Sequence, residues 1–176
     1  MSACDVVFGL EPRPLDAGAD AVLDAALDAP PDAPKCPALY GPVAGMPNVY
    51  RVMDTFDTWT TAESNCVSHS AGITHLVVPT QTQHLVALRS IPGLGRSWVG
   101  MGRDVGGSLD QFRTLTNVPV PRSSPLWETG EPSDTSGNDR VVELVDAGTM
   151  RLNDTNEAML HRYVCECDFL PITPFQ

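Results

Sequence analysis

The chain has 176 residues, of which 42% are hydrophobic, which is enough for one ordinary core but too little for two. Its formal net charge is −11 and no cluster of Lys or Arg is present, which argues against a surface for nucleic-acid phosphates. No apolar run approaches the roughly 18 residues that a transmembrane helix requires. These features predict one acidic domain without a membrane span.

The composition divides the sequence into parts. Residues 1–35 form an N-terminal segment and spacer, 36–168 a globular domain and 169–176 a C-terminal tail. Within the spacer, aspartates recur at every fourth position from Asp16 to Asp32, which would place like charges on one helix face. We therefore expect a solvated, disordered tether, because Ala, Asp and Pro bury too little apolar surface to order it.

Small residues precede Cys4, as in the last positions of a bacterial lipoprotein signal, although no apolar segment comes before them. Two interpretations stay open. Either Cys4 carries a lipid anchor in a bacterial secreted or lipoprotein-type protein, or it is an ordinary N-terminal cysteine.

The other cysteines are predicted to form disulfides. Cys36, Cys66, Cys165 and Cys167 follow the Pro-rich stretch, and four cysteines can pair in three ways. The histidines do not have metal-ligand spacing and no CxxC pair is present, so a zinc site is not expected. A paired set indicates an oxidising compartment.

The first predicted element of the domain is a helix within residues 55–69. Trp59, Ala62 and Cys66 recur there at helical intervals, and either Asp57 or Thr58 can serve as the N-cap.

A short apolar run over 73–78 follows, and then a second helix is predicted. Thr80 is expected to cap this helix, Leu85 and Leu88 share one of its faces, and Pro92 ends it.

The second half of the domain is predicted to contain strands separated by a long loop. Buried strands are expected over 97–101 and 140–145, and an alternating strand over 162–167. Residues 102–139 are rich in Gly, Pro, Ser and Asp and show little periodicity. A loop of that length inside a compact domain is usually functional or disordered.

The tryptophans and histidines in these elements are interpreted as structural residues. Trp59 and Trp98 lie in apolar patterns and are predicted to be core residues. His75 and His84 are interpreted as surface or boundary residues, because neither a serine elbow nor a nucleophilic cysteine accompanies them. The sequence therefore gives no reason to expect an enzyme.

Short motifs follow one another along the domain in a specific order. They are Cys36-Pro37; W-x-x-A-E-x-x-C at Trp59, Ala62, Glu63 and Cys66; W-V-G at Trp98, Val99 and Gly100; W-x-x-G-E-P at Trp127, Gly130, Glu131 and Pro132; Asn153-Asp154; and V-C-E at Val164, Cys165 and Glu166. Each motif alone is weak, but the series resembles the C-type lectin-like domain family over roughly residues 36–168.

This resemblance implies an α+β, C-type lectin-like fold, in which two helices flank small antiparallel sheets and a long irregular loop carries the ligand site. It also implies the disulfides Cys66–Cys165 and Cys36–Cys167. The chain departs from the family where Val141 and Glu157 replace a loop disulfide, and where Leu152 replaces the Trp of W-N-D.

The resemblance further implies a calcium site in the loop that contains Glu-Pro-Ser. The ligands carried over by position are Glu131, Ser133, Asp139, Asn153 and Asp154. Their carboxylate, hydroxyl and amide oxygens are the ligands that calcium prefers. A cis peptide at Pro132 would turn Glu131 and Ser133 to the same side, and Trp127 would anchor the root of the loop.

Family members that bind sugars complete the calcium shell with sugar hydroxyls, for which Glu131, Ser133, Asp139 and Asn153 would be the contacts here. The leading hypothesis is an extracellular or cell-surface module for calcium-dependent carbohydrate recognition, whose partner is a glycan. The alternative is a calcium-independent protein-binding or adhesion module whose partner is a surface protein. A solvated acidic loop and a hydrolase are the remaining interpretations.

Overall fold

The computed structural model describes residues 34–145 and 150–176 of the chain. Cys4 and the spacer up to residue 33 lie outside the described residues, so the anchor and the tether stay predictions. The elements are β1 (Gly41–Pro42), β2 (Val49–Asp57), α1 (Trp59–His69), β3 (Thr74–Leu76), α2 (Thr82–Arg89), β4 (Ser97–Gly102), the 3-10 helix η2 (Leu109–Gln111), β5 (Arg113–Thr114), β6 (Asp139–Leu144), β7 (Leu152–Asn156) and β8 (His161–Cys167).

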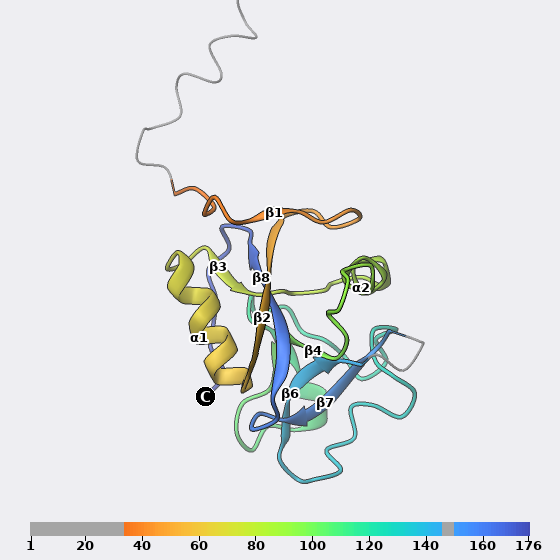
Figure 1. Cartoon of the computed structure of the whole chain (residues 1–176). Helices are drawn as coiled ribbons and strands as arrows, with labels where there is room; N and C mark the ends of the chain where they lie inside the picture. Colours follow the sequence, from red (N-terminus) through yellow and green to blue (C-terminus); the bar gives the residue numbers. More distant parts are fainter. Residues whose placement is uncertain (1–33, 146–149) are drawn as a thin grey trace, which may run out of the picture. The chain divides into compact units, whose positions relative to one another are not determined.

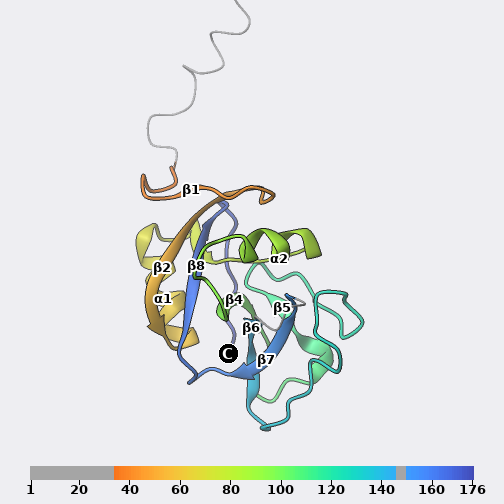
Figure 2. The same cartoon turned by 45° about the vertical axis from the view of Figure 1, so that its right-hand side comes forward.

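Within these residues eight strands form one mixed sheet in the order β1-β2-β8-β4-β6-β7, with β3 paired to β8 and β5 to β4. Strands β2 and β8, the first and last long strands, run antiparallel side by side (Figure 2). The expected small antiparallel sheets are joined by a short parallel pairing of β4 with β8, at Ser97 and Trp98. The α+β architecture is as predicted.

Helix α1 forms as the sequence predicts. Thr58 is the N-cap and accepts a hydrogen bond from the Thr61 amide, while Trp59, Ala62 and Cys66 form the buried face. The Trp59 indole donates to the carbonyl oxygen of Val99 at 2.9 Å, which ties the helix to β4. This packing fixes α1 beside the sheet (Figure 1).

The predicted cap of α2 is wrong. The N-cap is Gln81, and the backbone amide of Thr80 instead contacts His84 Nδ1 at 3.3 Å. Leu85 and Leu88 share the buried face, as predicted. The helix lies apart from α1 in Figure 1.

The sequence analysis did not predict strands β1, β2, β5 and β7. Strand β2 extends for nine residues immediately before α1, and β7 contains the Asn153-Asp154 pair that was interpreted only as ligands. Residues 103–138 form the long connection between β4 and β6, interrupted only by η2 and β5 among its described elements. This connection and the neighbouring end of β7 hold the candidate site.

The structure contains both disulfides that the resemblance implies. Cys66 on α1 is bonded to Cys165 on β8, and Cys36 is bonded to Cys167 on the same strand. The bonds therefore connect the start of the domain and its first helix to its last strand. No helix in the described part of the chain is long and apolar enough to cross a membrane.

Residues 169–176, which the sequence analysis sets apart as a tail, contact the domain. Phe175 packs against Trp59 with ring centroids 5.4 Å apart, and the Arg113 guanidinium lies 4.7 Å from the centre of the Phe175 ring. Ile172 also packs against the core, and the Thr173 amide donates to the carbonyl oxygen of Leu115 at 2.7 Å. The C-terminal segment thus lies along the first turn of α1 (Figure 1).

Candidate functional site

Trp127 anchors the root of the Glu-Pro-Ser loop, as predicted. Its side chain is buried, the indole donates to the Pro121 carbonyl oxygen at 3.0 Å, and its ring meets Phe112 edge-on at 5.2 Å. The adjacent Glu128 amide donates to the carbonyl oxygen of Leu152 on β7 at 2.9 Å. Leu152, which stands where the family has tryptophan, therefore still holds the loop to the sheet.

The loop turns toward Asp154 immediately after this anchor. The Glu131–Pro132 peptide is cis. The backbone amides of Ser133 and Asp134 then donate to the Asp154 carboxylate, at 2.9 Å to Oδ1 and 2.8 Å to Oδ2. Since Asp154 is buried on β7, these two bonds fix the loop directly over the strand.

The carboxyl group of Glu131 lies beside that of Asp154. Burial and, after it, the neighbouring Glu131 carboxyl raise the pKa of Asp154 to about 6, against the lowering effect of the Ser133 and Asp134 amides. Glu131 Oε2 is itself buried and has no hydrogen-bond partner among the described residues. Two neighbouring carboxyls in this environment favour a shared proton or a bound cation.

The side chains of the other three predicted ligands make contacts elsewhere. The Asp139 carboxylate accepts from the backbone amide of Ser136 at 2.9 Å and from its hydroxyl at 2.6 Å. The Asn153 amide donates to Glu143 Oε1 at 2.9 Å, on the face of β7 opposite Asp154. The Ser133 hydroxyl contacts Thr135 Oγ1 at 2.8 Å. The described structure therefore brings together Glu131, Asp154 and the backbone of Ser133.

Arg103, directly after β4, holds the Glu-Pro-Ser loop in place, and the sequence analysis did not identify it. Its guanidinium is buried, forms a 2.8 Å ion pair with Asp134, and donates to the backbone carbonyl oxygens of Asp139 and Gly107. The Asp139 amide and, after it, Arg103 lower the pKa of Asp134 against an opposing effect of burial. Nothing in the local sequence around Arg103 distinguishes it, because Asp134 and Asp139, two of its three partners, lie more than thirty residues along the chain.

A polar cleft of about 530 Å³ opens beside this loop. Arg103 and Asp134 line it on one side, and Arg140 and Glu157, which form an ion pair, line it as well. The cleft is large enough for a small polar ligand. Glu157 stands at one of the two positions of the family's loop disulfide, and its ion pair is with Arg140, the neighbour of Val141 at the other position.

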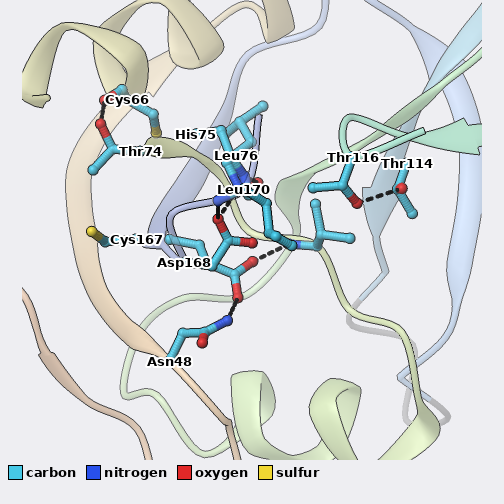
Figure 3. Close-up of polar contacts among 12 residues, drawn as sticks. Asn48, Cys66, Thr74, His75, Leu76, Thr114, Thr116, Cys167, Asp168 and Leu170 are labelled. Atoms are coloured by element: carbon cyan, nitrogen blue, oxygen red, sulfur yellow. Dashed lines mark hydrogen bonds and ion pairs between the residues drawn. The ribbon is translucent and has the colours of Figure 1, made fainter. Parts of the chain in front are cut away.

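A second polar cluster lies on β3 and β8, away from the loop. The His75 Nε2 atom is 3.0 Å from Asp168 Oδ1, and Nδ1 faces the carbonyl oxygen of Leu76 at 2.7 Å (Figure 3). With Glu166 these residues form a group at metal-ligand distances, the one such His/Cys/Asp/Glu group in the residues that the structure describes.

Hydrogen-bond donors of the protein already satisfy the Glu166 carboxylate in that cluster. Glu166 Oε1 accepts from the Asn48 amide at 2.7 Å and from the Tyr50 hydroxyl at 3.0 Å, and Oε2 accepts from the Val78 amide at 2.8 Å. Its hydrogen-bonding capacity is therefore used structurally. The interpretation of His75 and His84 as surface or boundary residues is wrong, because both side chains are buried.

Comparison with solved structures finds extensive likenesses to this domain. The C-type lectin CEL-I from Cucumaria echinata superposes with a TM-score of 0.63 at 21% identity, over 77% of this chain and 99% of that one. The C-type lectin domain of murine dendritic cell inhibitory receptor 2, in complex with N-glycan, gives 0.61 at 22% identity, over 76% and 99%.

A calcium-independent type II antifreeze protein superposes with a TM-score of 0.61 at 20% identity, over 75% of this chain and 93% of that one. The sequence matches no protein-family model and no curated protein. At such identities the likenesses show the fold.

Proposed function

Starting from a domain with the C-type lectin-like fold, we propose that this protein is a non-enzymatic binding module that recognises carbohydrate in a calcium-dependent manner. The proposed calcium ligands are Glu131, Ser133, Asp139, Asn153 and Asp154. The proposed sugar contacts are Glu131, Ser133, Asp139 and Asn153. The structural neighbours that support this proposal include a lectin domain in complex with N-glycan.

The observation that carries the proposal is the pair of carboxyls at Glu131 and Asp154. Each is held in place by the Glu-Pro-Ser loop or by β7, and one oxygen of Glu131 is buried without a partner among the described residues. A buried carboxylate oxygen of this kind costs free energy unless a proton or a cation compensates it. Calcium takes oxygen ligands of this type, so the two side chains fit the ion.

The remaining ligands fit less directly. Asp139 would have to give up its bonds to Ser136, and Asn153 its bond to Glu143, before either side chain could join the shell. These bonds have carboxylates as acceptors, and each hydrogen bond to a charged group contributes about 1.5 to 3 kcal/mol, so this rearrangement weakens binding. We therefore expect a dissociation constant of about 10⁻⁴ to 10⁻³ M, as in weak extracellular calcium modules.

When bound, the ion supplies coordination positions for two vicinal sugar hydroxyls. The chain would contribute hydrogen-bond acceptors from Glu131 and Asp139, and a hydroxyl from Ser133, which can both donate and accept. Ser133 lacks the amide that this position offers in Glu-Pro-Asn loops.

A second candidate function is a calcium-independent protein-binding or adhesion module. It is favoured by the positions of Asp139 and Asn153 and by the two backbone amides that satisfy Asp154 without a metal. A calcium-independent antifreeze protein also shares the fold. In this alternative the loop recognises a surface protein through its shape.

Both candidates place the protein outside the cytosol or at a cell surface. The two disulfides support this placement, because such bonds persist in oxidising compartments. A lipid on Cys4, with residues 11–35 as a tether, would hold the domain at a membrane. Mass spectrometry of the membrane fraction would test for that lipid.

The deciding experiment is a calorimetric titration of the chelator-treated protein with calcium, followed by glycan-array binding with and without the ion. Glu131→Gln removes one carboxylate and is expected to abolish calcium binding, whereas the exposed Asp110→Asn serves as a charge-matched control. Calcium binding that survives in Glu131→Gln would refute the ligand assignment. Calcium binding without any ion-dependent glycan signal would leave the metal site but refute the lectin, and no calcium binding at all favours the second candidate.

A further inference from the structure

The C-terminal segment is hydrogen-bonded along the first part of the connection between β4 and β6. The Thr173 amide donates to the Leu115 carbonyl oxygen at 2.7 Å, and the Val105 amide donates to the Gln176 carbonyl oxygen at 2.6 Å. None of these four residues belongs to a strand. The segment is therefore attached to the long connection by bonds that are additional to the sheet.

Arg113 on β5 joins the same two parts of the chain through its side chain. Its Nη1 donates to the Thr173 carbonyl oxygen at 2.9 Å, and its guanidinium lies 4.7 Å from the centre of the Phe175 ring. Its Nη2 is 3.1 Å from Asp104 Oδ1, which also accepts a bond from the Gln176 amide at 2.8 Å. One planar guanidinium thus contacts the ring, the segment's backbone and a carboxylate of the connection.

The two chain neighbours of Arg103 are both held by the C-terminal segment. On one side, a Cβ atom built on Gly102 would stand 2.8 Å from Phe175 Cε2, so the ring lies directly against the Gly102 backbone. On the other side, Asp104 accepts the bond from the Gln176 amide. The backbone that carries the Arg103 side chain is therefore fixed before and after it.

Arg103 in turn holds the Glu-Pro-Ser loop. Its guanidinium pairs with Asp134 at 2.8 Å and donates to the Asp139 carbonyl oxygen. It also lies 5.6 Å from the centre of the Phe112 ring, which meets the loop anchor Trp127 edge-on at 5.2 Å. A continuous series of contacts therefore connects the C-terminal segment to both the tip and the root of the loop.

We propose that Phe175 and Arg113 are positioning residues for the candidate site, because they fix Arg103 and Arg103 orders residues 131–139. The bonds of the guanidinium are directional, so it can hold the loop only while the backbone on either side of it stays in place. The order of the loop is a property of the chain alone. A consequence for calcium affinity, by contrast, rests on the proposed function.

The experiment follows amide hydrogen exchange of the full chain by NMR, with chelator in every solution. The reporters are the amides of Ser133, Asp134 and Asp139, which donate to carboxylates at 2.8–3.0 Å. Phe175→Ala is expected to speed their exchange about tenfold, because local opening of the loop becomes easier, and to leave α2 at the parent rate. Phe169→Ala, at an exposed phenylalanine of the same segment, is the matched control and should change neither. Equal acceleration in the loop and in α2, or none in the loop, would overturn the proposal.

A double-mutant cycle tests whether the effect passes through Arg103. Arg103→Met alone should also speed exchange of the reporter amides, and adding Phe175→Ala to it should cause little further acceleration. If the two accelerations instead multiplied, Phe175 would act on the loop independently of Arg103, which would overturn the proposal. Phe175→Tyr keeps the ring and should restore the parent rates. Exchange in Phe175→Tyr as fast as in Phe175→Ala would exclude the ring as the positioning group.

Arg113→Met provides a second variant in case Phe175→Ala loses its fold, which circular dichroism would reveal. It removes the bonds to Thr173 and Asp104, and it is expected to speed exchange of the reporter amides about tenfold as well. Unchanged reporter rates in folded Arg113→Met would overturn the proposal.

The calcium site is tested separately by replacing chelator with calcium, where Phe175→Ala and Arg113→Met should both bind the ion more weakly than the parent. A parent protein that binds no calcium would refute the proposed function and would leave the exchange result in chelator unaffected. Parent-like calcium affinity in both variants, together with accelerated loop exchange, would refute the consequence for the ion and confirm the positioning of the loop.

Discussion

The buried imidazole of His75 lies between two acceptors, with Asp168 Oδ1 3.0 Å from Nε2 and the Leu76 carbonyl oxygen 2.7 Å from Nδ1. Only the imidazolium form donates from both nitrogens. Burial alone lowers the pKa of His75, but the bonds to Asp168 and Leu76 outweigh it, and the net result is a raised pKa. The cluster is therefore built around a buried positive charge.

This arrangement predicts a loss of stability at rising pH. Since the folded-state pKa lies above the unfolded value of about 6.5, the stabilisation is complete below that value and is lost as pH rises through the folded-state pKa. Urea unfolding of the parent protein and of Asp168→Asn across this range checks the prediction. The free energy of unfolding of the variant should fall less over the same pH interval; parallel pH profiles would contradict it.

The Glu131–Asp154 pair predicts effects of opposite sign with and without calcium. In chelator, Glu131→Gln removes a like charge next to Asp154 and is expected to raise the free energy of unfolding by about 1 kcal/mol. In calcium, the same variant loses the stabilisation that ligand binding gives the parent. Thermal melts with chelator and with calcium, using Asp110→Asn as the control, measure both effects. Identical responses of Glu131→Gln and the parent to calcium would exclude this carboxylate as a ligand.

Any side chain larger than glycine at position 100, in the W-V-G motif, is expected to clash with the core. A Cβ atom added there would stand 2.5 Å from the Leu76 carbonyl oxygen and 2.9 Å from Leu115 Cδ1. Gly100→Ala is therefore expected to destabilise the domain by about 3 kcal/mol, as overpacking of a core does. Gly41→Ala, where a Cβ atom meets nothing within 4 Å, is the control. Denaturant unfolding of the two variants should show a clear difference.

Arg103 predicts a coupling between β4 and the Glu-Pro-Ser loop. Arg103→Met keeps the aliphatic part of the side chain but leaves the Asp139 and Gly107 carbonyl oxygens without their donor, at a cost of about 2 kcal/mol. Amide hydrogen exchange should accelerate in residues 131–139 and much less in α1. The exposed Arg122→Met is the control, and uniform acceleration over the whole domain would argue against a local role.

The sequence could predict the parts of the fold that depend on local periodicity or on the motif series. The face of α1 formed by Trp59, Ala62 and Cys66 follows from helical spacing. The anchoring of Trp127 and the pairing of the cysteines came from the resemblance and are present in the structure. These features need only short-range patterns or a familiar order of motifs.

The parts that were missed depend on distant partners. Strand β7 is polar, with Asn and Asp residues that are depleted in strands, and it becomes a strand because β6 pairs with it. Successive side chains on this strand point to opposite faces, so Asn153 bonds to Glu143 while Asp154 bonds to the loop. The positions of the ligands in the sequence do not predict this difference. His75 is buried for a similar reason, since Asp168 lies 93 residues away.

Strand β8 has a consequence for the order of assembly. It pairs with β2, β3 and β4, carries both Cys165 and Cys167, and follows every other helix and strand described in the chain. During synthesis, Cys36 and Cys66 therefore emerge long before their partners on β8. A chain that ends before His161 would lack the strand that pairs with β2, β3 and β4. The sheet can therefore form completely only after the last strand has been synthesised.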